Sequence, residues 1–333
     1  YGLTYPPDPA SYEESSIGGN VAENAGGLRC KRFGVTRDYV LGLKAVLADG
    51  TLLQTGIYAE HEAFPLTDLL VGSEGTLGCI VEIALRLVPL PGKGLTMLIS
   101  FINPASAAAT VSAINTSGLI PTVMEFLDGD AAAGSNSYEH QEGLEEAAGI
   151  LLIETDDRQA ERQLETIQQI AKANGCSHLR VAGDEKEVEE LWRVRRNLSK
   201  AAKALAELRI SEDVVVPNSQ FPVLVAFVAE MNKNSPVRIN SFGHAGDGNL
   251  HVNFMAETDS PAARAAIEQE IERLMTRTLA LGGTLSGEHG IGLAKRHFLS
   301  REFDAPTLKF MRGCKEALDP NNLLNPDKIF ENA

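Results

Sequence analysis

Cysteine is scarce in this sequence, and long apolar runs are absent. The 333 residues include four cysteines that lie far apart and form no CxxC pair: Cys30, Cys79, Cys176 and Cys314. This pattern excludes a disulfide framework and an iron–sulfur cluster held by cysteines, and it favours a reducing compartment. No apolar run reaches the roughly 18 residues of a membrane span, and no signal peptide opens the chain. We therefore expect a cytoplasmic protein.

Basic residues are also fewer than acidic residues. The chain has 30 basic and 45 acidic residues and a net charge of −15, which argues against nucleic acid or an anionic membrane as the main partner. A local basic pocket is compatible with this charge. With 44% hydrophobic and 23% charged residues, the composition excludes disorder, collagen and coiled coil, and it suffices for two or more packed cores.

The first part of the chain predicts an α+β region with much loop. The sequence begins at Tyr1 and passes several prolines before any regular element, so we expect a fragment that lacks an upstream part. Residues 16–27 have the glycine content of a loop. Strands are expected on both sides of an Asp49–Gly50 turn and again at residues 78–90. Prolines and glycines at residues 89–94 then predict a boundary.

The order of elements after this boundary predicts a ferredoxin-like sheet. Strand and helix patterns follow one another as β-α-β-β-α-β, which gives four antiparallel strands with two helices on one face. These elements are expected at residues 95–101, 104–118, 122–128, 149–155, 158–175 and 177–183. Three further strands widen the sheet, at residues 212–217, 237–243 and 249–255, and helices are expected at residues 185–206, 261–283 and 305–319. The predicted fold class is α+β.

The densest polar cluster lies at residues 241–255. If residues 245–248 form the turn of a hairpin, His244 faces Asn249 across the strands, and Asn249, His251 and Asn253 share one face. An apolar row opposite a polar row is ordinary for a half-exposed strand. Two imidazoles within reach of one ion are less ordinary and suit Zn, Mn or Fe. Two ligands do not make a site, so a third is needed.

Glu288 and His289 are the candidates that could complete this site. They lie in a glycine-rich segment, SGEHGIG, at residues 286–292. The glycines permit sharp turns and close backbone approach, so one of the two side chains could bind a metal while its neighbour moves a proton. The alternative is a helix-terminating loop with solvated side chains. Because neither an HExxH nor an EF-hand pattern is present, the metal prediction rests on clustering alone.

Arg195 falls on the apolar stripe of the helix expected at residues 185–206, a stripe that includes Leu191 and Leu198. A core-facing arginine costs desolvation free energy unless an anion meets it, and a substrate carboxylate is one such anion. An internal salt bridge or a snorkelling aliphatic stem is the alternative.

Residues 68–82 carry glycines at positions 72, 75 and 78 ahead of a strand pattern. Such a loop can present backbone N–H groups to a flat or phosphorylated ligand. Its spacing matches neither the Rossmann fingerprint nor the P-loop.

Five ordered motifs together resemble the FAD-linked 2-hydroxyacid dehydrogenases of the vanillyl-alcohol-oxidase superfamily, a family that includes glycolate oxidase catalytic D subunits and D-lactate dehydrogenases. The motifs are SIGGNVAENAGG, DLLVGSEGTLG, GHAGDGNLHVNFM, SGEHGIG and LDPNNLLNPDKIF. The resemblance implies the C-terminal part of a PCMH-type FAD-binding domain at residues 1–92, whose upstream lobe is missing. It further implies a cap domain with a widened ferredoxin-like antiparallel sheet at residues 93–265 and a C-terminal helical segment, residues 266–333, that returns to the flavin.

The resemblance also implies a role for individual residues. Metal ligands would be His244, His251 and Glu288, the base would be His289, and substrate contacts would be Asn253 and Arg195. The residues expected to contact FAD are Ser16, Gly18, Gly19, Asn20, Asn24, Gly26, Gly72, Glu74, Gly75, Thr76, Gly78, Ile80 and Asn325.

The implied reaction is oxidation of a small 2-hydroxy acid to the 2-oxo acid. A divalent Zn, Mn or Fe ion would bind the substrate hydroxyl and carboxylate, His289 would take the hydroxyl proton, and the hydride would pass to flavin N5. Relatives acting on longer dicarboxylates carry an added lysine near residues 208–213. Here Ile210 and Ser211 stand in that stretch, which favours glycolate or lactate.

The resemblance implies electron transfer to a separate acceptor, such as an iron–sulfur protein or an electron-transfer flavoprotein. It leaves open a homodimer and peripheral attachment to the inner membrane through a partner subunit. Two other hypotheses stay open at this point. One is a flavin-free metal-dependent hydrolase that uses the same ligands, and the other is a non-catalytic scaffold subunit of an electron-transfer complex.

Overall fold

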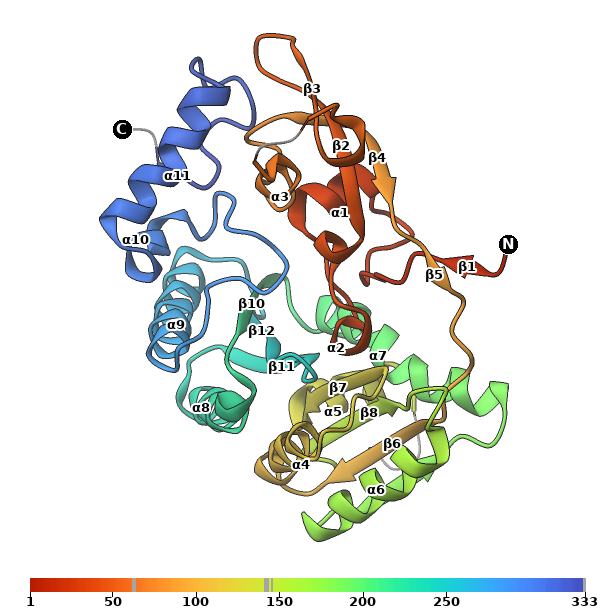
Figure 1. The fold of residues 1–333 in the computed structure, drawn as a ribbon. Helices are drawn as coiled ribbons and strands as arrows, with labels where there is room; N and C mark the ends of the chain where they lie inside the picture. The colour runs from red at the N-terminus through yellow and green to blue at the C-terminus, as the bar shows by residue number, and fades with distance from the viewer. Residues whose placement is uncertain (62–63, 141–143, 145, 332–333) are drawn as a thin grey trace. The chain divides into compact units, whose positions relative to one another are not determined.

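The computed structural model describes residues 1–61, 64–140, 144 and 146–331, apart from the side chains at 199, 202, 203 and 205. The chain forms two compact units (Figure 1). Unit 1 comprises Tyr1–Leu90 and Leu285–Ala333, and unit 2 comprises Pro91–Thr284. Within the described residues, no helix combines the length and the apolar character that crossing a bilayer requires.

Unit 2 is built on one seven-stranded antiparallel sheet, with strand order β10-β12-β11-β7-β8-β6-β9. Strands β7, β8, β6 and β9 have the order of a ferredoxin-like sheet, as the sequence predicts, and β10, β11 and β12 widen it. The strands are β6 (Thr96–Phe101), β7 (Val123–Asp128), β8 (Gly149–Glu154), β9 (His178–Val181), β10 (Leu208–Val215), β11 (Arg238–His244) and β12 (Asn249–Ala256).

Helices cover both faces of this sheet, because successive side chains of a strand point to opposite faces. On β7, the ring of Phe126 packs edge-on against Phe221 of α8, whereas Leu127 joins a cluster with residues of α5 and α7. Helix α4 packs beside α6 and α8, and α8 packs beside α9. The helices are α4 (Pro104–Thr116), α5 (Gly129–Tyr138), α6 (Ala160–Ala173), α7 (Glu185–Leu205), α8 (Phe221–Asn234) and α9 (Pro261–Ala280).

Two of these helices, α5 and α8, are absent from the sequence prediction. The α8 segment is almost continuously apolar over its first eight residues, so it lacks the period that marks an amphipathic helix. Helix α5 consists mainly of small residues with weak amphipathicity. Helix α9 packs on β10 and β12, so the contacts group it with the sheet, and unit 2 extends to residue 284.

Unit 1 contains a three-stranded sheet, β3-β2-β4, and a two-stranded β1–β5 pair. Strands β2 and β3 flank the predicted Asp49–Gly50 turn. Helix α11 agrees with the prediction for residues 305–319. The elements are β1 (Leu3–Thr4), α1 (Ile17–Glu23), α2 (Cys30–Phe33), β2 (Val40–Val46), β3 (Leu52–Gln54), α3 (Leu66–Leu70), β4 (Cys79–Leu85), β5 (Val88–Pro89), α10 (Leu299–Glu302) and α11 (Ala305–Leu318).

Residues 16–27, expected to be a loop, include helix α1. The Ser16 side chain caps this helix by accepting a hydrogen bond from the Gly19 backbone N–H at 3.0 Å. Val21 is fully buried in a cluster with Leu43 and Leu70. Asn24 then adopts a left-handed conformation and ends the helix. Capping and burial therefore outweigh the low helix propensity of the glycines.

Candidate active site

The β11–β12 hairpin places two imidazoles side by side. Residues 245–248 form the turn, as predicted, and Phe242 pairs with His251 in the register. The ring centroids of His244 and His251 are 5.3 Å apart at 89°. These side chains are not half-exposed as expected: His244 and His251 retain 5% and 6% of their accessible surface. Buried imidazoles of this kind need polar partners.

Glu125 on β7 is the buried partner of His244, and the sequence analysis does not identify it. Glu125 Oε1 lies 2.5 Å from His244 Nδ1, and the Arg195 Nε–H donates to Glu125 Oε2 at 2.5 Å. The side chain of Glu125 is 0% exposed. Burial alone would raise its pKa, but the electrostatic and hydrogen-bond interactions with His244 and Arg195 outweigh burial and lower the pKa of Glu125 to about 2. A single acid in the apolar segment TVMEFLD is the signal that could have revealed it.

The Glu125 carboxylate fixes the orientation of the His244 ring. An ionised carboxylate only accepts hydrogen bonds, so the Nδ1–H of His244 donates to it. The other ring nitrogen, Nε2, is then the one with a lone pair for a ligand. A carboxylate behind a ligating histidine is a common arrangement in metal sites.

Arg195 forms an internal salt bridge, one of the two alternatives that its position on the apolar stripe of α7 allows. Its guanidinium pairs with Glu125 and lies 5.0 Å from the centroid of the Phe242 ring. The side chain is 11% exposed. Helix α7 places it there because Leu191, Val194 and Leu198 bury the same stripe. The charge of this arginine is therefore compensated within unit 2.

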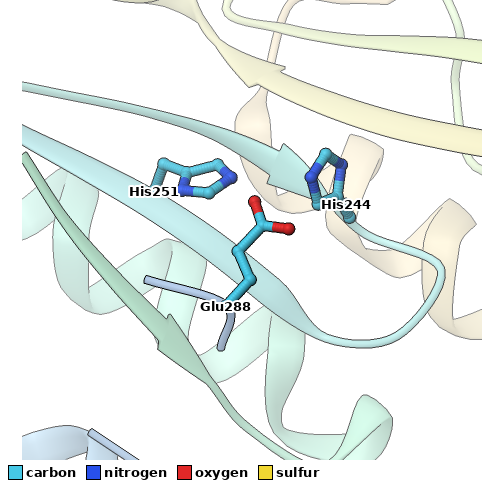
Figure 2. A group of neighbouring side chains, drawn as sticks. All are labelled: His244, His251 and Glu288. Carbon is cyan, nitrogen blue, oxygen red and sulfur yellow. The ribbon is translucent and has the colours of Figure 1, made fainter. Parts of the chain in front are cut away.

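Glu288 supplies a carboxylate to the two histidines. The ligand atoms of His244, His251 and Glu288 all lie within 4.8 Å of one another. Figure 2 shows the two imidazoles on neighbouring strands with the Glu288 carboxylate directed between them. Glu288 follows Thr284, whose backbone pairs with Val215 at the end of β10. Two imidazole nitrogens and one carboxylate oxygen suit a divalent Zn, Mn or Fe ion, so the residues fit such a metal.

The other two predicted catalytic residues have different surroundings. His289 is exposed on the loop next to Glu288. Asn253 is fully buried, and its amide is engaged at both ends. Its Oδ1 accepts two hydrogen bonds from Arg209, at 3.0 and 2.7 Å, and its Nδ2–H donates to Asn240 at 2.9 Å.

Unit 1 brings together the predicted cofactor segments. The backbone N–H of Gly72 donates to Val21, and that of Glu74 donates to Ala22, so residues 72–78 lie against helix α1. The side-chain amide of Asn325 donates to the Glu74 carbonyl at 2.6 Å. Gly75 has φ +65°, and a Cβ there would lie 2.7 Å from Asn325 Nδ2, so this close approach requires glycine.

Several side chains predicted to contact FAD also hold these segments together. The Glu74 carboxylate accepts from the N–H groups of Ile291 and Gly292 at 2.6 and 2.8 Å. The Thr76 hydroxyl donates to the Ser73 carbonyl at 2.7 Å. Asn24 accepts from the Arg37 N–H at 2.8 Å, and Ile80 packs against the unit 1 core. The remaining positions, Ser16, Gly18, Gly19, Asn20, Gly26 and Gly78, lie on α1, beside it or at the start of β4.

Two serine hydroxyls in these segments fit a polar cofactor. Ser15 Oγ and Ser73 Oγ are buried and have no hydrogen-bond partner in the described part of the chain. Ser73 also lines a cavity of about 170 Å³ with Gly72 and Thr76. Orphaned buried hydroxyls are uncommon and point to a missing partner. They stand next to glycine-rich backbone, as a flavin-binding region would require.

Comparison with known proteins places the chain in a family. Residues 90–329 match the family described as "FAD linked oxidases, C-terminal domain", and residues 1–56 match "FAD binding domain". The chain belongs to the FAD-linked oxidases. This confirms the predicted family and the FAD cofactor, and it makes the chain part of an FAD-dependent oxidoreductase. The flavin-free hydrolase hypothesis gains no support from it.

The curated relatives of this FAD-linked oxidase match nearly its full length. It is 38% identical to glycolate oxidase subunit GlcD of Bacillus subtilis (strain 168), covering 99% of this chain and 71% of the relative. It is 34% identical to D-lactate dehydrogenase of Anaerostipes hadrus, covering 98% and 71%. Identity to GlcD of Escherichia coli (strain K12) is 32%, covering 98% and 66%.

Solved structures share the fold of this FAD-linked oxidase at low identity. 4-Ethylphenol oxidase from Gulosibacter chungangensis matches with a TM-score of 0.76 at 15% identity, covering 99% of this chain and 72% of that one. An alkyldihydroxyacetonephosphate synthase matches with a TM-score of 0.69 at 20% identity, covering 98% and 60%. These likenesses support the mixed α and β architecture and carry no statement about substrate.

Proposed function

We propose that this FAD-linked oxidase oxidises a small 2-hydroxy acid to the 2-oxo acid. The observation that carries the proposal is the group formed by His244, His251 and Glu288, whose ligand atoms lie within 4.8 Å of one another. Relatives named as a glycolate oxidase subunit and a D-lactate dehydrogenase support this substrate class.

In this proposal, His244, His251 and Glu288 hold a divalent ion of Zn, Mn or Fe. When bound, such an ion would polarise the hydroxyl of the substrate, and FAD would supply the acceptor for the hydride. Glu125 orients His244 by accepting from Nδ1, so Nε2 is the ring nitrogen that would bind the ion. The backbone of residues 72–78 and the hydroxyls of Ser15 and Ser73 would hold the flavin.

His289 is the proposed base that takes the hydroxyl proton. It is adjacent to Glu288 in the chain, and its exposed imidazole can exchange that proton with water. His289→Ala in the full-length protein is expected to lower turnover by about 10²- to 10⁴-fold with flavin content unchanged. The control is His178→Ala. His178 is an exposed histidine on β9, the edge strand farthest from β10 in the seven-stranded sheet. Undiminished turnover in His289→Ala would remove the base assignment.

The proposal includes a cytoplasmic location and a separate electron acceptor, an iron–sulfur protein or an electron-transfer flavoprotein.

The test of the function is anaerobic mixing of the full-length flavoprotein with D- and L-enantiomers of short 2-hydroxy acids. Bleaching of the visible flavin absorbance by one of them is the expected result. A flavin that stays oxidised with every 2-hydroxy acid of the panel would contradict the proposal. That result would favour the hypothesis of a non-catalytic scaffold subunit.

A further inference from the structure

Arg209 on strand β10 is a partly buried cation that has no counter-charge among the described residues. Its only side-chain partner in the described residues is Asn253 Oδ1, which accepts from Nε and Nη2 at 3.0 and 2.7 Å. No described carboxylate lies within ion-pair distance of the guanidinium. Burial lowers the pKa of Arg209, with no nearby acid to oppose the shift.

The other arginines on this sheet are paired with acids. Arg238 on β11 is paired with Asp130, and Arg180 on β9 is paired with Glu187 and Glu190. A cation withdrawn from water needs an anion or several hydrogen bonds to offset its desolvation. Of the five N–H donors of a guanidinium, Asn253 takes two, so three remain for a ligand.

The strand register places Arg209 on the face that carries the histidines. Ser211 pairs with Asn253, and Asp213 pairs with His251. Because Arg209 is two residues from Ser211, its side chain emerges on the same face. Its hydrogen bonds to Asn253 bring the guanidinium to a position two residues along β12 from His251. Two residues of a strand span roughly 7 Å.

This separation matches the length of a substrate with two carboxylates. In an extended five-carbon chain the terminal carbons are about 5 Å apart, from four bonds of about 1.5 Å each. The carbon chain and one hydrogen bond of about 3 Å together reach from a substrate hydroxyl at the histidines to the guanidinium of Arg209. Arginine is also the side chain whose planar fork best matches a carboxylate.

We propose that Arg209 binds a second carboxylate of the substrate and makes this site selective for 2-hydroxy dicarboxylates of four or five carbons. The inference rests on the proposed function and narrows its substrate class. It differs from the sequence expectation of glycolate or lactate, which followed from Ile210 and Ser211 and the lack of a lysine in that stretch. The lack of an acidic partner for Arg209 among the described residues can be seen only in the structure, not in the sequence.

The test uses the full-length flavoprotein and two variants, Arg209→Met and Arg209→Lys. Malate, 2-hydroxyglutarate, lactate and glycolate are compared in both enantiomers, where they exist, by anaerobic flavin reduction and by calorimetric binding. Arg209→Met is expected to raise KM and Kd for the dicarboxylates at least tenfold and to change those for lactate less than threefold. Arg209→Lys keeps the charge and loses the fork, so an intermediate effect is expected. Arg180→Met, from the opposite edge strand, is the control and should behave as the wild type.

The outcomes separate this inference from the proposed function. If lactate or glycolate reduces the flavin and the dicarboxylates bind no better, the inference is overturned and the function stands. Equal losses for both substrate classes in Arg209→Met and Arg209→Lys would show that Arg209 only positions Asn253, which also overturns it. If no hydroxy acid reduces the flavin but the dicarboxylates bind through Arg209, the anion site stands and the proposed function fails.

Discussion

Glu125 illustrates, at the scale of a single residue, how a buried charge depends on its partners. The carboxylate is fully buried and bonds to both Arg195 and His244. Sequence patterns do not reveal this link, because it joins residues 70 and 119 positions apart. Arg195 and the two histidines stand out in the sequence by residue type, whereas the partner that organises them does not.

Glu125→Gln tests this link. The substitution leaves the charge of Arg195 buried without its counter-ion, so we expect unfolding free energy to fall by about 3–5 kcal/mol. Metal affinity is expected to drop about 10- to 100-fold, because His244 loses the carboxylate that orients it. Urea unfolding and metal titration measure the two effects.

Glu189→Gln is the matched control, because Glu189 pairs with Arg196 at an exposed position of α7. A surface pair contributes about 0–1 kcal/mol, so this variant should resemble the wild type. Equal stabilities of the two variants would contradict the account of Glu125.

At the scale of elements, Lys315 of α11 ties the C-terminal segment to the predicted cofactor loop. Its ammonium donates to the Thr76 carbonyl at 3.0 Å and to the Leu324 carbonyl at 2.8 Å, and it also pairs with Asp319. The side chain of Asp319 is fully buried and accepts from the Leu323 and Leu324 N–H groups. The position of Asn325, and with it the loop at residues 72–78, depends on this arrangement.

Lys315→Met is expected to loosen the attachment of the C-terminal segment to the loop at residues 72–78. It leaves the Asp319 carboxylate buried without its cation, so unfolding free energy should fall by about 3–5 kcal/mol, and FAD should dissociate more readily. Flavin fluorescence on dilution and urea unfolding report the two effects. Lys309→Met, an exposed position on the same helix, serves as the control. Unchanged FAD retention in Lys315→Met would contradict this role for the segment.

The sequence predicts short apolar strands and amphipathic helices better than helices of weak amphipathicity. Strands β6, β7 and β8 are short, almost continuously apolar runs buried on both faces, and α11 is amphipathic, so these elements agree with their patterns. Helices α5 and α8 lack a clear division into a polar and an apolar face. Helix α1 depends on the Ser16 cap and on burial of Val21, which are features of the folded chain. Among site residues, His244 and His251 follow from the hairpin, but the partners of Arg195, Asn253 and Arg209 follow only from packing.

At the scale of the whole molecule, two acids with raised pKa values make stability depend on pH between about pH 4 and pH 7. Burial raises the pKa of Asp128 in unit 2 to about 7 against hydrogen bonds from Ala131 and Ser241. Burial, with the charge of Glu74, raises the pKa of Glu23 in unit 1 to about 7. Their ordinary values are 3.8 and 4.5. The folded chain therefore holds protons that the unfolded chain releases between about pH 4 and pH 7.

Stability from these two acids is fully present below about pH 4 and is lost as pH rises through about 7. We expect Tm, measured by calorimetry, to fall between pH 5 and pH 8 as these two acids lose their protons. Asp128→Asn retains a side-chain oxygen for the cap of α5 and cannot titrate, so its pH profile should be flatter. A wild-type slope in Asp128→Asn would contradict the assignment.

Metal binding by His244, His251 and Glu288, which we propose serves oxidation of a 2-hydroxy acid, can be tested directly. The direct measurement is the rate of anaerobic flavin reduction in the full-length protein before and after removal of metal by a chelator, with metal content checked by elemental analysis. We predict that removal of the metal lowers the rate of flavin reduction at least a hundredfold, with the flavin retained, and that adding Zn, Mn or Fe restores the rate. An unchanged rate in protein shown to be free of metal would contradict it.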